Sequence, residues 1–458
     1  MKGPEAVTAG PGWRIKLPGF LSAGLVVLAL LVLTARPSFA VPAFAVQTGQ
    51  PCSGCHVGGF GPQLTPFGRA FKLGGYTLRT DTFNVPVSVM AQGSYVRTAK
   101  AQPPPPTRDF ALNDNVAVDQ VSLFIAGGLG DHLGAFVQTT YDGVARGFHW
   151  DNLDLRAVTT TTIHKASVIL GLTVNNAPTV QDAFNTLPAW GFAYSTSSLA
   201  PSPAAAPLIG SLAQNTVGVT GYAWINSELY AEFGGYRSPS ARFLNHMGID
   251  PTDPGNISGT APYGRLAYNK NLGTQNFEIG AFGMAANINP GHDQSTGLTD
   301  HYGDLGLDAS YQLFAAKRNV VTVNARYTHE SQRLDASQAL GLTANSHLHL
   351  QDFRIDASYY WHDRIGFTVQ PFDTWGKPDV LLYGANRTYA PDSSGVLLQV
   401  DGTPWGEGGS PLGPRFNMRL GVQYTAYAAF DGAGRNYDGL GRNAGDNNTV
   451  RVFAWLAY

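Results

Sequence analysis

FNMRLGVQYTAYA, residues 416–428, alternates between two kinds of side chain along its length. The even positions, among them Leu420 and Val422, are apolar, whereas the odd positions, among them Arg419 and Gln423, are mostly polar. A period of two predicts a β-strand with one apolar and one polar face. A strand of a water-soluble sandwich shows the same period, so the fold class depends on how often the pattern recurs.

The pattern recurs along most of the chain, for example in residues 319–333 and 447–458. We expect sixteen strands, at 84–98, 115–130, 133–143, 150–163, 165–175, 216–226, 227–237, 261–271, 275–288, 301–315, 319–333, 346–361, 363–375, 395–404, 414–428 and 447–458. An even number of strands is typical of single-chain bacterial barrels in the outer membrane.

The expected connections alternate between short and long. The short ones lie at 130–132, 164–165, 226–227, 270–271 and 317–319. The long ones lie at 99–114, 176–215, 238–260, 289–300, 334–345, 376–394 and 429–446. Outer-membrane barrels have short periplasmic turns and long extracellular loops. This rule predicts that both chain termini face the periplasm.

Composition supports a barrel that contacts lipid. Charged residues make up only 14% of the 458 residues, against about 25% in ordinary soluble domains. Without residues 1–40, which hold four basic residues and one acidic residue, the net charge changes from −2 to about −5, which gives no indication of nucleic-acid binding. After the first forty residues no apolar run is long enough for a transmembrane helix. The sequence therefore predicts an all-β fold, a porin-like 16-stranded outer-membrane barrel over residues 81–458.

Residues 1–40 have the features of an export signal. Basic residues, among them Lys16, precede the apolar run FLSAGLVVLALLVLTA at 20–35, and small residues end at Ala40. A membrane anchor is the alternative, but the run is shorter than the ~20 residues that span a bilayer. We expect cleavage before Val41.

The chain's only two cysteines lie in the motif Cys52-x-x-Cys55-His56. This spacing is the attachment signature of c-type haem, in which both thiols bond the porphyrin and the imidazole becomes the proximal iron ligand. A redox disulfide and half of a zinc site are the alternatives. Neither finds its usual context, because no βαβ setting and no second ligand pair accompany the motif.

Motifs around the haem signature and near the C-terminus resemble the fused monohaem cytochrome–porins, a family of outer-membrane iron oxidases. They are PAF at 42–44, QTG at 47–49, LTPFGRAFK at 64–72, GY at 75–76, LGVQY at 420–424 and NYDGLGRN at 436–443. Val46 departs from the basic residue that often precedes QTG in this family. The resemblance covers essentially the whole mature chain.

The resemblance implies an oxidoreductase with one covalent haem c in residues 41–80, which acts as a plug of the barrel. It also implies an extracellular donor, Fe(II), and a periplasmic electron carrier, either a c-type cytochrome or a cupredoxin. Forty residues are too few to bury a haem alone, so the barrel wall is expected to complete the pocket.

The second axial ligand of the haem must come from outside residues 41–80, which contain no Met and no second His. Alternation places Met90 and Met284 on lumen faces, and we name both as candidate distal ligands. His347 and His349 are further candidates, expected to point inward near the outer rim. A thioether ligand raises the haem potential, which suits a weak reductant such as Fe(II). Ordinary lumen side chains are the alternative reading of all four.

Four arginines are expected on lumen positions: Arg326, Arg354, Arg419 and Arg451. Guanidinium groups bind carboxylates in a bidentate manner, so these residues are candidates for binding the haem propionates. Porins without haem also carry lumen arginines that tune selectivity, and that alternative stays open.

Carboxylate and imidazole groups, which bind Fe(II), gather in the long connection near residue 290. The candidate contacts for extracellular Fe(II) are His292, Asp293, Asp300 and His301, with a thinner cluster at Asp250 and Asp253. Ordinary loop polarity explains the same residues without any iron site.

Two classes of function remain. The first is electron transfer from extracellular Fe(II), or through the same route from a different donor. The second is a transport porin whose haem plug gates or stabilises the pore. No G-x-S-x-G, H-E-x-x-H or Gly-rich phosphate-loop motif points to another chemistry.

Overall fold

A computed structural model describes residues 43–80, 86–406, 410–412 and 416–458. The predicted export signal lies outside these residues and stays a prediction. Among the described residues, no helix has the length and apolar character needed to cross a membrane.

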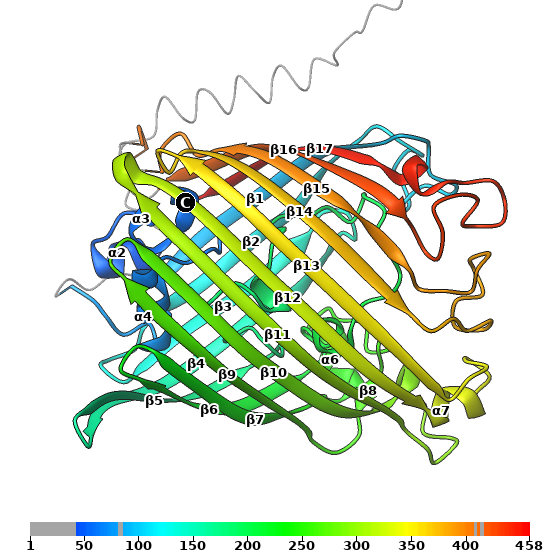
Figure 1. The fold of residues 1–458 in the computed structure, drawn as a ribbon, viewed down its shortest axis with the longest axis horizontal. Helices are drawn as coiled ribbons and strands as arrows, with labels where there is room; N and C mark the ends of the chain where they lie inside the picture. Colours follow the sequence, from blue (N-terminus) through cyan, green and yellow to red (C-terminus); the bar gives the residue numbers. More distant parts are fainter. Residues whose placement is uncertain (1–42, 81–85, 407–409, 413–415) are drawn as a thin grey trace, which may run out of the picture.

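The strands form one closed antiparallel sheet (Figure 1). The sixteen long strands are β1 (Val87–Thr98), β2 (Asn115–Gly128), β3 (Leu133–Asp142), β4 (Gly147–Ile163), β5 (Ala166–Asn175), β6 (Val217–Ile225), β7 (Leu229–Arg237), β9 (Ala261–Leu272), β10 (Gln275–Asn289), β11 (Asp300–Ala315), β12 (Asn319–Leu334), β13 (His347–Trp361), β14 (Ile365–Gly376), β15 (Ser393–Gly402), β16 (Asn417–Ala429) and β17 (Thr449–Ala457). The two-residue strand β8 (Asn256–Ile257) pairs with the end of β10. Each long strand pairs with its neighbours in sequence, and β1 pairs with β17 to close the barrel.

The predicted 16-stranded barrel is therefore confirmed, and every predicted strand lies within three residues of the observed one. The short strand β8 was not predicted, because two residues cannot show a period. Short helical turns in the connections were also missed: α6 (Ala241–His246), η3 (Pro290–His292), η4 (Ala316–Arg318), α7 (Asp335–Ala339) and η5 (Ala444–Asn447).

The two faces of the wall differ as the alternation requires. On β16, Asn417 and Arg419 are buried in the lumen, whereas Leu420 and Val422 are exposed on the outside. The same outward exposure of large apolar side chains occurs around the barrel, for example at Leu305 on β11. A closed barrel with an apolar outer surface is the architecture with which proteins cross the outer membrane.

The inward orientation predicted for His347 and His349 is wrong. Both side chains are exposed on the outer face of β13, whereas Leu348 and Leu350 are buried inside. The alternation in which Asp352 faces inward continues to this end of the strand, so Leu348 and Leu350 also face inward. The prediction assumed that polar side chains point inward. That assumption fails at this end of the strand because, beyond the apolar band, the outer surface meets water and the inner surface packs against loops.

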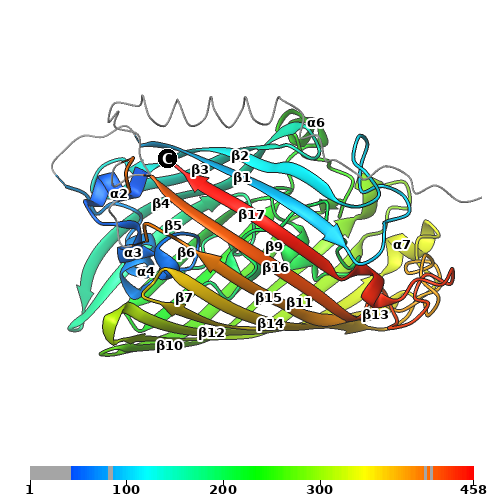
Figure 2. The same cartoon turned by 90° about the horizontal axis from the view of Figure 1, so that it is seen from above.

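Residues 43–80 lie at one end of the barrel, beside the C-terminus, as Figures 1 and 2 show. They form four short helices: α2 (Ala43–Thr48), α3 (Cys52–Cys55), η1 (Val57–Gly59) and α4 (Pro66–Leu73). Their polar groups bond to inward-facing side chains of the wall, for example Tyr222 on β6 and Asn417 on β16. The segment therefore lies inside the barrel mouth.

The connection 176–215 is not an outward loop, contrary to the prediction. It folds back into the lumen, contains η2 (Pro188–Trp190) and α5 (Leu208–Ser211), and we call it the inner loop. Its residues 176–187 are almost completely buried. The length rule failed here because inward-facing charges of the wall bind this segment, and loop length carries no information about such partners.

Topology gives the first testable prediction. If the end with the long loops is extracellular, a protease site inserted at Pro104, which is exposed in the 99–114 connection, should be cleaved on intact cells. The same site at Lys317, exposed in the turn before β12, should be cleaved only after the outer membrane is permeabilised. Cleavage at Lys317 but not at Pro104 on intact cells would reverse the orientation.

Candidate functional site

The two cysteines lie on one helical turn. The His56 amide donates to the Cys52 carbonyl at 2.8 Å, and this bond closes α3. Both thiols are free and half-buried. Helix α4 packs directly on the turn, because a Cβ at Gly68 would lie 2.3 Å from the Cys55 carbonyl oxygen. The turn is thus held from one side, and the two thiols form no disulfide with each other.

His56 lies deeper than the thiols. Its Nδ1 is buried and has no hydrogen-bond partner. Burial, reinforced by the charge of Arg419, lowers the pKa of the imidazole to about 4. The ring is therefore neutral at pH 7 and available as a metal ligand. Burial also raises the pKa of the Cys55 thiol to about 11, which disfavours the redox-active disulfide reading, since that chemistry needs a thiolate.

A cavity of about 440 Å³ opens beside these three residues. Its size falls within the range of small-molecule and cofactor sites. The lining contains Cys52, Cys55 and His56 together with Met90 of β1. It is rich in aromatic rings from the N-terminal segment, the inner loop and the wall: Phe44, Phe60, Phe71, Phe124, Phe136, Trp190, Tyr194 and Trp455.

The two candidate thioethers lie in different places. Met90 is 8% exposed and packs in a cluster with Phe453 and Trp455 on the wall of the cavity. Met284 does not line the cavity and packs with Tyr263 and other residues of a separate cluster. The structure therefore brings only Met90 into one cavity with the CxxCH motif.

The four arginines point inward, as predicted, but none lines the cavity. Each forms an ion pair with an aspartate of the wall: Arg326–Asp352 at 3.1 Å, Arg354–Asp352 at 3.2 Å, Arg419–Asp401 at 3.3 Å and Arg451–Asp119 at 2.8 Å. Arg419 also donates to the Gly58 carbonyl at 3.2 Å. Arg326 and Arg354 share Asp352, so the four guanidinium groups are paired with three aspartates of the wall.

Gly58 and Gly59 allow the segment to approach the wall closely. Both have positive φ, and a Cβ at Gly59 would lie 2.3 Å from the Cα of Gly406. The amide of Gly58 donates to Asp363 at 2.5 Å, and Asn417 donates to the Gly59 carbonyl at 2.8 Å. A side chain at either position would push the residues after His56 away from the wall.

Helix α4 is fixed on the other side of the lumen. Lys72 Nζ donates to the carbonyls of Val180 and Asp182 in the inner loop, each at 2.7 Å. The Tyr222 hydroxyl of β6 donates to the Leu73 carbonyl at 2.6 Å. Sequence reasoning missed these contacts, because Lys72 has no local partner that marks it.

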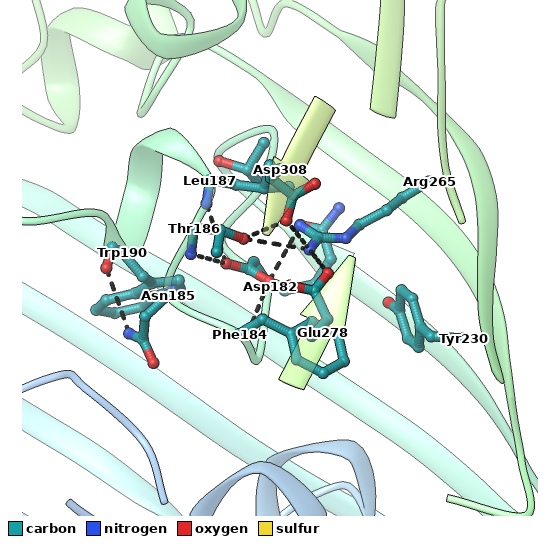
Figure 3. A network of polar contacts seen from close by, with 12 residues as sticks. Asp182, Phe184, Asn185, Thr186, Leu187, Trp190, Tyr230, Arg265, Glu278 and Asp308 are labelled. Atoms are coloured by element: carbon teal, nitrogen blue, oxygen red, sulfur yellow. Dashed lines mark hydrogen bonds and ion pairs between the residues drawn. The ribbon is translucent and has the colours of Figure 1, made fainter. Parts of the chain in front are cut away.

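The inner loop is held by a buried cluster of charges (Figure 3). Arg265 of β9 forms ion pairs with Asp182 at 3.1 Å, with Glu278 at 3.2 Å and with Asp308 at 2.7 Å. The Thr186 hydroxyl donates to Asp308 at 2.5 Å. Charge partners from β9, β10 and β11 thus fix the loop beside the cavity.

The same loop bonds to the N-terminal segment. Asn185, labelled in Figure 3, accepts from the Leu64 amide at 2.8 Å and donates to the Pro62 carbonyl at 2.9 Å. The inner loop therefore connects the wall to the residues that follow the CxxCH motif.

The four candidate Fe(II) contacts do not converge. Asp300 is fully buried and accepts from the amide and hydroxyl of Ser337, whereas His301 contacts Asn287. Asp293 is exposed and accepts from the amide of Ser295. Within the described ranges, no group of three His, Cys, Asp or Glu side chains is arranged to hold a metal ion. Asp250 of the thinner cluster bonds locally to Thr252.

No protein-family model matches the chain, and no curated protein matches it. Among solved structures, it is similar to OprB of Pseudomonas putida at high pH, with 11% identity over 81% of this chain and 93% of that chain and a TM-score of 0.47. Salmonella typhi OmpF in complex with daunomycin is 13% identical over 83% of this chain and 100% of that chain, with a TM-score of 0.44. The anion-selective porin of Comamonas acidovorans is 14% identical over 81% of this chain and 98% of that chain, with a TM-score of 0.43. The fold assignment rests on the closed sheet of the chain itself.

Proposed function

We propose that the barrel carries one covalent haem c and transfers electrons from extracellular Fe(II) to a periplasmic carrier. The observation that supports this most directly is the single cavity shared by Cys52, Cys55, His56 and Met90. Thioether bonds from the two thiols, an imidazole ligand and a thioether ligand form the donor set of cytochromes c. Haem iron supplies a reversible one-electron carrier at this site.

The surroundings fit such a group. The His56 imidazole is buried and neutral at pH 7, the state in which a histidine can bind iron. The cavity wall is mostly aromatic and apolar, which matches the porphyrin faces. The thiols are only half-buried, and the segment that carries them lies at the barrel end beside the C-terminus, the end with the short turns (Figure 1). We assign that end to the periplasm.

The electron count is simple. Each Fe(II) that is oxidised outside gives one electron to the site and leaves as Fe(III), and the site returns one electron to an oxidised carrier such as a c-type cytochrome or a cupredoxin. The chain contributes burial, which excludes water from the site, and a wall that separates donor from acceptor. The candidate cluster around residue 290 is not required by this proposal.

Rapid anaerobic mixing tests the proposal. Purified oxidised protein mixed with Fe(II) should develop the spectrum of reduced haem, and subsequent addition of an oxidised cytochrome c or cupredoxin should reverse it. Dithionite serves as the control that reports reducible haem independently of donor. Reduction by dithionite but not by Fe(II) would leave the haem assignment intact and reject Fe(II) as donor; quinols and other reduced metals would then be compared.

Conductance measurements test the alternative function, a transport porin. Since residues 43–80 and the inner loop both occupy the lumen, we expect planar bilayers containing the protein to show a conductance far below that of an open 16-stranded porin. An open-porin conductance together with no reduction by Fe(II) would favour transport.

A further inference from the structure

Three buried polar atoms of cavity-lining residues have no hydrogen-bond partner: Nδ1 of His56, the hydroxyl of Tyr194 and Nε1 of Trp455. His56 belongs to the proposed iron site. The other two are donors in an otherwise largely apolar wall. Leaving a buried donor unpaired is destabilising, so a cavity built with two of them is expected to receive an acceptor.

The two donors come from separate elements that meet at one place. Tyr194 belongs to the inner loop, and its ring packs edge-on against Phe192 at 5.3 Å between centroids. Trp455 belongs to β17, is 6% exposed, and packs against Phe60 of the N-terminal segment at 5.0 Å. Both rings pack in the cluster that contains Met90. Loop, wall and segment thus converge on this part of the cavity.

Both groups act as donors. The Tyr194 phenol, like tyrosine hydroxyls in general, carries its proton at neutral pH and can donate it in a hydrogen bond. The indole Nε1 has no acceptor function. The best acceptor for two such groups is an anionic carboxylate, since bonds to an ionised partner are stronger than neutral ones.

We propose that the Tyr194 hydroxyl and the Trp455 indole N–H bind the propionate carboxylates of the haem. The inference rests on the proposed function, because the haem supplies the carboxylates. It also reassigns a role first given to four arginines, each of which is already paired with an aspartate of the wall. Neutral donors would hold the propionates without adding a net positive charge to the lumen.

Phenylalanine substitutions of the holoprotein test this role, because they keep an aromatic ring and remove the donor. Tyr194→Phe and Trp455→Phe should each shift the propionate bending band in the resonance Raman spectrum. Each should also lower the reduction potential, since an unscreened propionate stabilises Fe(III). The matched controls are Tyr263→Phe and Trp224→Phe, which also remove unpartnered buried donors but lie outside the cavity, and they should change neither quantity.

The possible results distinguish a failure of the propionate assignment from a failure of the proposed function. Propionate bands and potentials that are unchanged in both variants, in protein with covalent haem, would overturn the assignment. A change of iron ligation in Tyr194→Phe would also overturn it, since Tyr194 would then be an axial ligand. Wild-type protein without covalent haem would instead refute the proposed function itself, which a haem stain of a denaturing gel reveals before any variant is compared.

Discussion

Replacing Cys52 and Cys55 together by serine is expected to remove essentially all covalent haem from the protein. The two thiols are the chain's only cysteines, and both line the same cavity as His56. With no thiol left, no thioether bond can form, so a denaturing gel stained for haem should show no signal at the mass of the chain. The effect is all-or-none because the bond is chemical rather than a sum of weak contacts.

Two controls make this result specific. Ser53→Ala changes a residue between the thiols and should keep the haem stain, because Ser53 supplies no ligand and does not line the cavity. Circular dichroism and outer-membrane fractionation of the double variant should still report a β-barrel, since the sheet closes through β1 and β17 without the cysteines. Extraction of haem from denatured wild-type protein by acidified organic solvent would contradict covalent attachment.

The barrel was predictable from sequence because its signal repeats. A period of two on segments such as 416–428 is weak evidence alone, but sixteen such segments separated by turns leave few alternatives. In the middle of each strand, the sequence also predicted which side chains face inward, and Arg419 and Arg451 face inward as predicted. The prediction failed where lipid no longer dictates which face is apolar, as at His347 and His349.

The path of the inner loop was not predictable for a different reason. Asp182 reads as an ordinary loop acid, and only the folded barrel brings Arg265 of β9 to it at 3.1 Å. Partners that lie more than eighty positions apart leave no local pattern. The loop therefore looked extracellular by its length, although its residues 176–187 are buried in the lumen.

The site was predictable only in its covalent part. The spacing of Cys52, Cys55 and His56 is the signature of haem attachment, and it can be recognised without knowledge of the fold. The rest of the cavity comes from residues such as Met90 and Trp455, whose meeting depends on the closure of β1 onto β17. The arginines were chosen for their charge, but sequence does not reveal that aspartates of the wall already pair with them.

The second large effect is expected from Met90. Among the described residues, Met90 is the only methionine that lines the cavity, and His56 is its only histidine. A thioether opposite an imidazole raises haem potential, and axial ligands together tune it over about 0.8 V. Met90→Leu should therefore lower the potential by roughly 100 mV or more, which disfavours reduction by Fe(II) roughly fiftyfold at ~59 mV per decade.

Redox titration and the absorption spectrum of the purified protein check this expectation. Leucine is close to methionine in volume, so the barrel should assemble and the haem stain should stay normal while the thioether signature in the near-infrared is lost. Met284→Leu is the matched control, because Met284 is equally buried in the lumen but packs outside the cavity. A normal potential in Met90→Leu would exclude Met90 as ligand.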